Sequence, residues 1–326
     1  MNSSLLPSRI LAALLILVLQ PAALTAASAE ASSQELLNAG RVDEAIQALQ
    51  QQIHRSPNDA ASYNFLCRAY FMLNDWDPGI DACAHARDLD RQSSLYSLWL
   101  GRIYGEKADR AGWLAAAGLA KKVRTAFESA VELNPKSWEA RTDLAEFYLE
   151  APGIVGGGKD KAQVQADALR SLNPARADWV EGKIAEKNKD FPTAERQYRA
   201  AVTDSHSGCR AWLDVASFLR RTNRLDEMEQ ALRQLESCSL DHPEALLDGA
   251  NMLLRTGRDY PLGVRLLHRY LSAPCEEGPA FKAHESLGQF FERQGDRRAA
   301  AEQYRSALAL AHSYARAQED LNRIEH

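Results

Sequence analysis

The segment from Gly153 to Lys159 comes closer than any other part of the chain to a chemical motif, because it has the spacing G-x-x-x-x-G-K of a phosphate-binding loop. Such a loop needs a serine or threonine after the lysine to hold magnesium, and a β-strand before the first glycine. Here Asp160 follows the lysine and would repel phosphate. A helix ending near Glu150 is expected before the loop. We therefore interpret residues 151–160 as a flexible loop between two helices.

The remaining reactive side chains have no catalytic spacing. The eight histidines are scattered, and none forms the HxxxH or HExxH pattern of a helix-borne zinc site. The sequence contains neither the GxSxG of a hydrolase nor a CxxC pair. Most carboxylates fall on predicted solvent faces of helices. We therefore predict no enzyme activity, no metal and no cofactor.

Four of the five cysteines form two candidate pairs. In a helical hairpin, residues at equal distances from the turn face each other. Cys67 and Cys83 are centred on the turn LNDWD, and Cys209 and Cys238 on the turn RTNRL. This spacing predicts disulfides 67–83 and 209–238, with Cys275 free. The alternative is that Cys67 and Cys83 only replace the usual small and bulky core residues.

The elements that carry these residues repeat along the chain. The stretches SYNFLCRAYFMLNDWDPGIDACAHARDL, GKIAEKNKDFPTAERQYRAAV and GQFFERQGDRRAAAEQYRSALAL each predict a helix, a short polar turn and a second helix. Small residues recur in the first helices at Cys67, Gly101, Ala145, Gly182, Ala216, Ala250 and Gly288. In most second helices a small residue is followed four places later by a ring or branched residue. Two helices approach closely only where side chains are small, and the large residue fills the groove beside that contact.

This pattern resembles the tetratricopeptide-repeat (TPR) family, whose unit is about 34 residues long. The resemblance covers about residues 31–314 and implies an all-α solenoid, a right-handed superhelix of antiparallel helix pairs. We place eight units at 31–59, 60–93, 94–137, 138–174, 175–208, 209–242, 243–280 and 281–314. Residues 315–326 are expected to form a polar-faced capping helix, which the end of a solenoid needs for solubility.

Two units depart from the regular repeat. The third carries about ten extra residues within 105–122 (GEKADRAGWLAAAGLAKK), which should lengthen its helices. The fourth carries the glycine-rich insertion 151–160 and lacks the usual bulky residue, since Ala166 stands there. Regular repeats need neither insertion, so these are the expected places for a feature specific to this protein.

The resemblance also implies a concave surface lined by the first helices, which in this family takes peptides or helices. Projected onto that surface, the first helices carry Asn64, Arg68, Arg102, Trp179, Lys183, Arg210, Arg220, Arg221, Asn251 and Arg255. The fourth unit instead offers Glu139, Glu146 and Glu150. Arginine suits carboxylate recognition and tryptophan suits anchoring, so the partner could be acidic. The alternative is an ordinary solvated face.

We thus expect a scaffold that binds a protein or peptide. The other hypotheses are a glycan- or nucleotide-binding role for the loop 151–160 and a self-assembling structural subunit. The net charge of −5 argues against a duplex nucleic-acid binder, which needs a basic excess.

The first 29 residues have the features of a secretory signal peptide. Arg9 is followed by the apolar run from Ile10 to Leu19, and Ala27-Ser28-Ala29 fits a cleavage site. The run is too short to span a bilayer as a helix, and no later stretch is apolar enough to do so. We expect cleavage, a chain that starts near Glu30 and a periplasmic location, with secretion as the alternative. The competing interpretation is an uncleaved amphipathic arm.

Overall fold

The computed structural model describes residues 33–273 and 279–326, which are almost entirely helical. The predicted signal peptide and Cys275 lie outside these residues. Residues 33–38 are helical. The first half of the chain forms α2 (Val42–Arg55), α3 (Ala60–Leu73), α4 (Trp76–Leu89), α5 (Ser94–Arg110), α6 (Trp113–Leu133), α7 (Trp138–Glu150), the 3-10 turn η1 (Gly153–Val155), α8 (Lys159–Leu169) and α9 (Pro174–Lys187). The second half forms α10 (Phe191–Asp204), α11 (Cys209–Arg221), α12 (Leu225–Arg233), the 3-10 turn η2 (Gln234–Glu236), α13 (Glu244–Thr256), α14 (Tyr260–Leu271), α15 (Ala280–Arg293), α16 (Arg297–Leu310) and α17 (Ala315–Glu325).

Consecutive helices pack as pairs, and the pairs stack. Each first helix, from α3 through α5, α7, α9, α11 and α13 to α15, contacts its own second helix, and each of them up to α13 also contacts the first helix of the next pair. No β-strand forms within the described ranges. The all-α solenoid predicted from the sequence is therefore confirmed.

Glycines in the first helices set the distance within three of the pairs. A Cβ atom at Gly182 of α9 would lie 2.9 Å from the ring of Tyr198 in α10, so only a hydrogen atom leaves room for this buried ring. The same arrangement recurs at Gly101 and Gly288, which face Phe127 and Tyr304. These are the small and bulky positions on which the repeat was predicted.

The two insertions have different structures. The third pair is lengthened as expected, since α5 has 17 residues and α6 has 21. The glycine-rich insertion was expected to be a flexible loop, but it forms a compact turn. The amides of Gly156 and Gly158 donate to the carbonyl oxygens of Gly153 (3.0 Å) and Tyr148 (2.8 Å). The turn needs glycine at 157, where a Cβ would overlap the carbonyl oxygen of Ala151. Local hydrogen bonds thus order the insertion.

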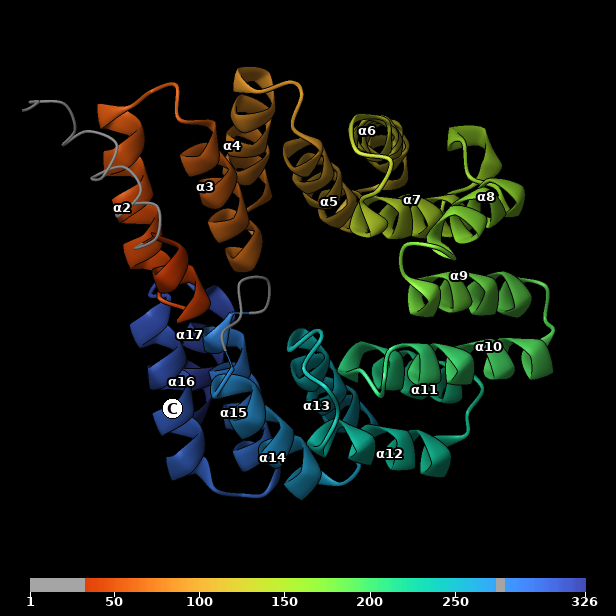
Figure 1. Cartoon of the computed structure of the whole chain (residues 1–326). Coiled ribbons are helices and arrows are strands. Elements are labelled where there is room, and N and C mark those ends of the chain that lie inside the picture. The colour runs from red at the N-terminus through yellow and green to blue at the C-terminus, as the bar shows by residue number, and fades with distance from the viewer. Residues whose placement is uncertain (1–32, 274–278) are drawn as a thin grey trace, which may run out of the picture.

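The array of helices bends until its two ends meet, which closes it into a ring (Figure 1). Residues from both ends share one buried cluster. Its members are Leu37, Val42, Ala45, Ala69 and Met72 from the first helices and Phe281, Ala307, Ala311, Tyr314 and Ala317 from the last. Helix α17, which corresponds to the predicted capping helix, packs on α16, and its Ala317 also belongs to the contact with the first helices.

Close backbone approach and polar contacts accompany the closure. Gly40 adopts φ +71°, and a Cβ there would lie 2.6 Å from the Cβ of Ala280. The amide of His312 donates to Asp43 (2.6 Å), and Lys282 donates to the side-chain oxygen of Asn74 (3.1 Å). We name this junction the end-to-end contact.

Candidate functional site

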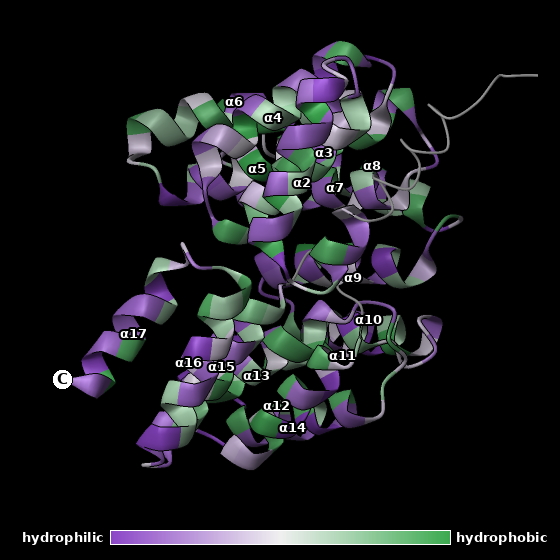
Figure 2. Cartoon of the chain, turned by 90° about the vertical axis from the view of Figure 1, so that its left-hand side faces the viewer, coloured by the Kyte–Doolittle hydropathy of each residue, from purple (hydrophilic) through white to green (hydrophobic). Residues whose placement is uncertain are grey.

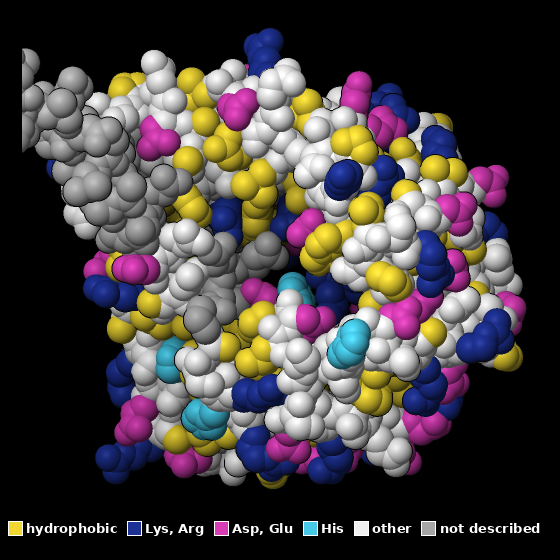
Figure 3. All heavy atoms as spheres, viewed as in Figure 1, with side chains coloured by type: hydrophobic (Ala, Val, Ile, Leu, Met, Phe, Trp, Pro, Cys, Tyr) yellow, Lys and Arg dark blue, Asp and Glu magenta, His cyan; other side chains and the backbone are white. Residues whose placement is uncertain are grey.

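The ring encloses a hollow, which we call the central channel. Side chains from opposite sides of the ring reach it, among them Arg102 of α5, Asp143 and Glu146 of α7, Arg210 of α11 and His242 just before α13. Figure 3 shows the hollow near the centre of the face, with charged and histidine side chains at its edges. The first helices therefore line an inner surface, as the sequence predicted for the solenoid.

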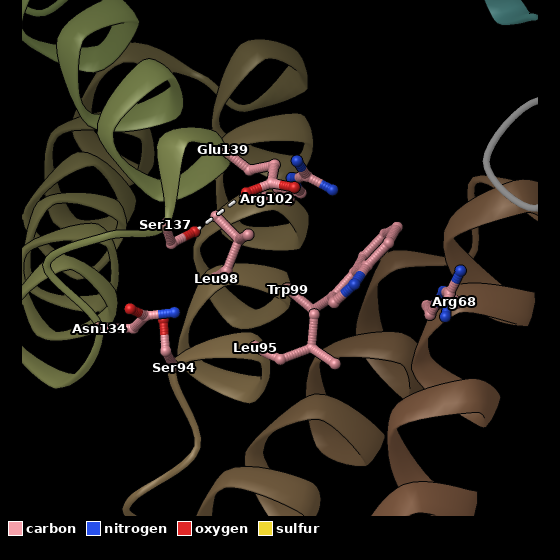
Figure 4. Close-up of a pocket in the computed structure, with 9 residues that line it drawn as sticks. All are labelled: Arg68, Ser94, Leu95, Leu98, Trp99, Arg102, Asn134, Ser137 and Glu139. Carbon is pink, nitrogen blue, oxygen red and sulfur yellow. Dashed lines mark hydrogen bonds between the residues drawn. The ribbon is translucent and has the colours of Figure 1, made fainter. Parts of the chain in front are cut away.

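The early predicted residues gather around one indole. The guanidinium groups of Arg68 and Arg102 lie 4.9 and 5.0 Å from the ring of Trp99, and both arginines line a pocket of about 360 Å³ (Figure 4). Arg102 also donates to Asp143 at 2.7 Å. Asn64 is buried in α3, and so is Arg68. Arg68 and Arg102 thus lie together at this pocket, whereas Asn64 is not exposed to a ligand.

Later predicted residues are mostly paired within the protein. Lys183 forms an ion pair with Glu150 (2.9 Å), and Arg221 with Glu186 (2.6 Å). Trp179 is buried rather than free, because the guanidinium group of Arg176 covers its ring at 4.3 Å. Asn251 accepts a hydrogen bond from Ser286 at 2.8 Å. Charges from the first helix of the next or the previous pair thus neutralise much of the predicted basic stretch.

Three of the predicted cations have no carboxylate partner among the described residues. Within the described ranges, the guanidinium groups of Arg210, Arg220 and Arg255 form neither an ion pair nor a hydrogen bond. Arg220 and Arg255 are exposed in the last turns of α11 and α13. Arg210 is half-buried and lines the central channel. The structure therefore leaves Arg210 as the predicted cation that is both inside the channel and available to a ligand.

Enclosure by the ring shifts the titration of two side chains in the channel. Burial, reinforced by Arg210, Arg176 and Arg102, lowers the pKa of His242 to about 3. Its ring is therefore neutral at pH 7, and Nδ1 can donate to Glu244 at 3.2 Å. The Glu146 side chain is exposed to the channel, yet the surrounding protein raises its pKa by desolvation, against the opposing charge of Lys183. The interior of the ring thus disfavours the charged form of both side chains.

One wall of the channel was not predicted from the sequence. Trp113 and Ala117 of α6, Phe147 of α7 and Ile154 of η1 form an apolar wall, with the carboxylate of Asp109 beside it. The signal was present in the two insertions, which contribute most of these residues. The sequence indicated that the insertions carry a feature specific to this protein. It did not show that the two insertions lie next to each other.

Within residues 33–273 and 279–326, no three His, Cys, Asp or Glu side chains are placed to hold a metal ion. In the same ranges no helix combines the length and apolar character needed to cross a membrane.

The structure brings the predicted cysteine partners together. The Cα atoms of Cys67 and Cys83 lie 5.1 Å apart, and those of Cys209 and Cys238 lie 5.0 Å apart. Both distances suit a disulfide.

Comparison with known proteins supports the repeat assignment. A family model described as "Tetratricopeptide repeat" matches residues 36–103. No curated protein matches the chain in sequence. Among solved structures, the chain is similar to TTC0263, a thermophilic TPR protein of Thermus thermophilus. That similarity has a TM-score of 0.50 and 16% identity, and it covers 60% of this chain and 98% of that one.

The chain is also similar to yeast Tom70, with a TM-score of 0.50 and 16% identity. This similarity covers 87% of the chain but 58% of Tom70. At these identities the comparisons establish the fold alone. The stacked helix pairs, the small and aromatic positions between them and the family match all point to the same repeat.

Proposed function

Because the chain is a tetratricopeptide-repeat protein, we propose that it is a scaffold that holds a protein or peptide partner in its central channel. The observation that carries this proposal is Arg210, a half-buried guanidinium group in the channel with no carboxylate partner in the described structure. A planar guanidinium binds a carboxylate through two parallel hydrogen bonds. Arg210 would therefore receive one acidic group of the partner.

A binding role fits the structure better than a catalytic one. Repeat solenoids bury their apolar residues between neighbouring pairs and leave broad surfaces free. The glycine-rich turn offers little support for the nucleotide alternative, because the amides of Gly156, Gly157 and Gly158 all donate to carbonyl oxygens of the same segment or of α7. A phosphate loop would need such amides to point at the ligand.

Affinity capture from the cell-envelope fraction of the source organism tests the proposal. The wild-type chain should retain a partner, and Arg210→Glu should lose most of it, because a carboxylate would then face a carboxylate. Arg298→Glu is the matched control, since Arg298 lies on α16 and is 92% exposed. Equal retention by wild type and Arg210→Glu would contradict binding in the channel.

We also propose that the protein is exported and works in the periplasm. The apolar segment after Arg9 and the two close cysteine pairs support this, since disulfides persist in oxidising compartments. Intact-mass measurement on the envelope fraction should find a chain that starts near Glu30. The same mass in the medium would indicate secretion, and a full-length chain in the cytoplasm would contradict export.

A further inference from the structure

The two insertions of the repeat array meet at one surface. The lengthened α6 contacts η1, the turn formed by the glycine-rich insertion, and Arg124 of α6 donates to the carbonyl oxygen of Val155 at 3.3 Å. Together with the end of α5 and the inner face of α7 they line a groove of about 900 Å³ that opens into the central channel. Figure 2 shows the apolar first turns of α6 projecting from the body of the ring. We call this surface the insertion groove.

Large apolar side chains at the insertion groove are left uncovered. Trp113 is 80% exposed and Ile154 is 92% exposed, although both belong to ordered helical segments. Between them, Ala116, Ala117 and Ala120 offer a surface of small side chains. Small residues beside a large apolar side chain allow a second helix to approach closely. The helix pairs of the repeats pack in the same way. Exposed clusters of this kind mark interaction sites.

The charged side chains of the insertion groove indicate which kind of partner segment can bind there. Five carboxylates and two guanidinium groups line it. Asp143 is paired with Arg102, and Glu150 is paired with Lys183. The carboxylates of Asp109 and Glu146 form no ion pair with any described residue.

A partner that covered the apolar wall would bring Asp109 and Glu146 close to its own side chains. Unpaired carboxylates that lose water are costly, so they favour a cation on the partner. We propose that the insertion groove binds an amphipathic helix of a partner protein, with an apolar stripe against Trp113 and Ile154 and Lys or Arg beside it. This inference rests on the proposed scaffold function and names the chemistry of the segment that enters the channel.

Two designed 14-residue helical peptides test the proposal. Both carry the same leucine stripe, and they differ only in having Lys or Glu beside it. Fluorescence anisotropy of labelled peptides on the full chain should show binding of the Lys peptide at least about tenfold tighter than that of the Glu peptide. High salt should reduce this preference. Equal affinity of the two peptides would overturn the proposal.

Variants locate the binding. Trp113→Ser with Ile154→Ser should weaken the Lys peptide by about 10- to 30-fold, because buried aromatic anchors dominate such interfaces. Val164→Ser is the matched control, since Val164 is 61% exposed on α8 outside the groove. Asp109→Asn with Glu146→Gln should bring the two peptides to similar affinities. All these side chains are exposed, so circular dichroism and thermal melting should match the wild type. Wild-type affinity in the Trp113 and Ile154 variant would overturn the proposal.

Two further outcomes separate this inference from others. If light scattering finds a wild-type dimer that Trp113→Ser makes monomeric, a second copy occupies the groove and the proposal is overturned. If the envelope partner is lost by Arg210→Glu but kept by Trp113→Ser with Ile154→Ser, the channel function stands and the groove assignment fails. Loss of the partner in both variants supports the two proposals together.

Discussion

Replacing Phe281 with alanine is expected to lower the free energy of unfolding by about 3–5 kcal/mol, the usual cost of removing a buried phenylalanine from a core. Phe281 is fully buried in the end-to-end contact, and its ring lies 4.8 Å from that of Tyr314. The cavity would lie where the first and last helices meet. Small-angle X-ray scattering should therefore show a larger radius of gyration, because the ring opens there first.

The control for this effect is on the same helix. Phe290→Ala also removes a fully buried ring, but Phe290 packs against Tyr260 and Gly263 inside the solenoid. It should destabilise the protein by a similar amount without changing the radius of gyration in the native state. An unchanged radius in Phe281→Ala would contradict a closed ring in solution.

A second pair of variants tests the closure by steric clash. Gly40 and Gly295 both adopt a positive φ, at +71° and +84°. Alanine is strained at either position, but only at Gly40 would its Cβ meet another helix, at Ala280. Gly40→Ala should therefore open the ring, whereas Gly295→Ala should not. Equal scattering curves for the two variants would show that the clash at Ala280 does not open the ring.

Replacing Cys209 and Cys238 with serine is expected to cost about 3–4 kcal/mol of unfolding free energy, the chain-entropy value for a bridge over 29 residues. The pair lies in a repeat whose second helix is short. Helix α12 has only nine residues, and it gives way to η2 before Cys238. A bond would tie this short second helix to the start of α11, next to the backbone hydrogen bond from Cys209 to Ser239 (2.9 Å). Urea unfolding of the wild type and of the serine variant measures the difference.

The second cysteine pair gives an internal comparison. Cys67 and Cys83 are 16 positions apart and lie in two regular 14-residue helices, so their bond should contribute about 3 kcal/mol. Reductant should lower the stability of the wild type but leave a variant without the four cysteines unchanged. Mass spectrometry of a non-reduced digest identifies the bonds directly. Free thiols at all four positions would contradict both.

The repeated part of the fold could be predicted because each pair depends on local rules. Gly101 and Gly182 lie in the same helix pair as the rings for which they leave room, and their spacing is visible in the sequence. Ring closure could not be predicted in the same way. It depends on small rotations summed over all pairs, and it joins Val42 to Phe281, which are far apart in the sequence.

The candidate site was predicted in part for a related reason. Helical phase placed Arg102 and Arg210 on the inner surface, where the structure has them. An ion-pair partner comes from another repeat, so the sequence could not show that Arg102 pairs with Asp143 while Arg210 has no carboxylate partner among the described residues. The glycine-rich insertion was misjudged as flexible, because its hydrogen bond from Gly158 to Tyr148 depends on the preceding helix.

The end-to-end contact also limits what the molecule can assemble into. In an open repeat array, the outer face of a terminal helix exposes apolar side chains. Another copy can bind to this face, so that fibres grow head to tail. Here Leu37 and Val42 are shielded by α15, α16 and α17 of the same chain. Each molecule thus buries its own terminal surfaces. Polymerisation through these surfaces would require the end-to-end contact to open first.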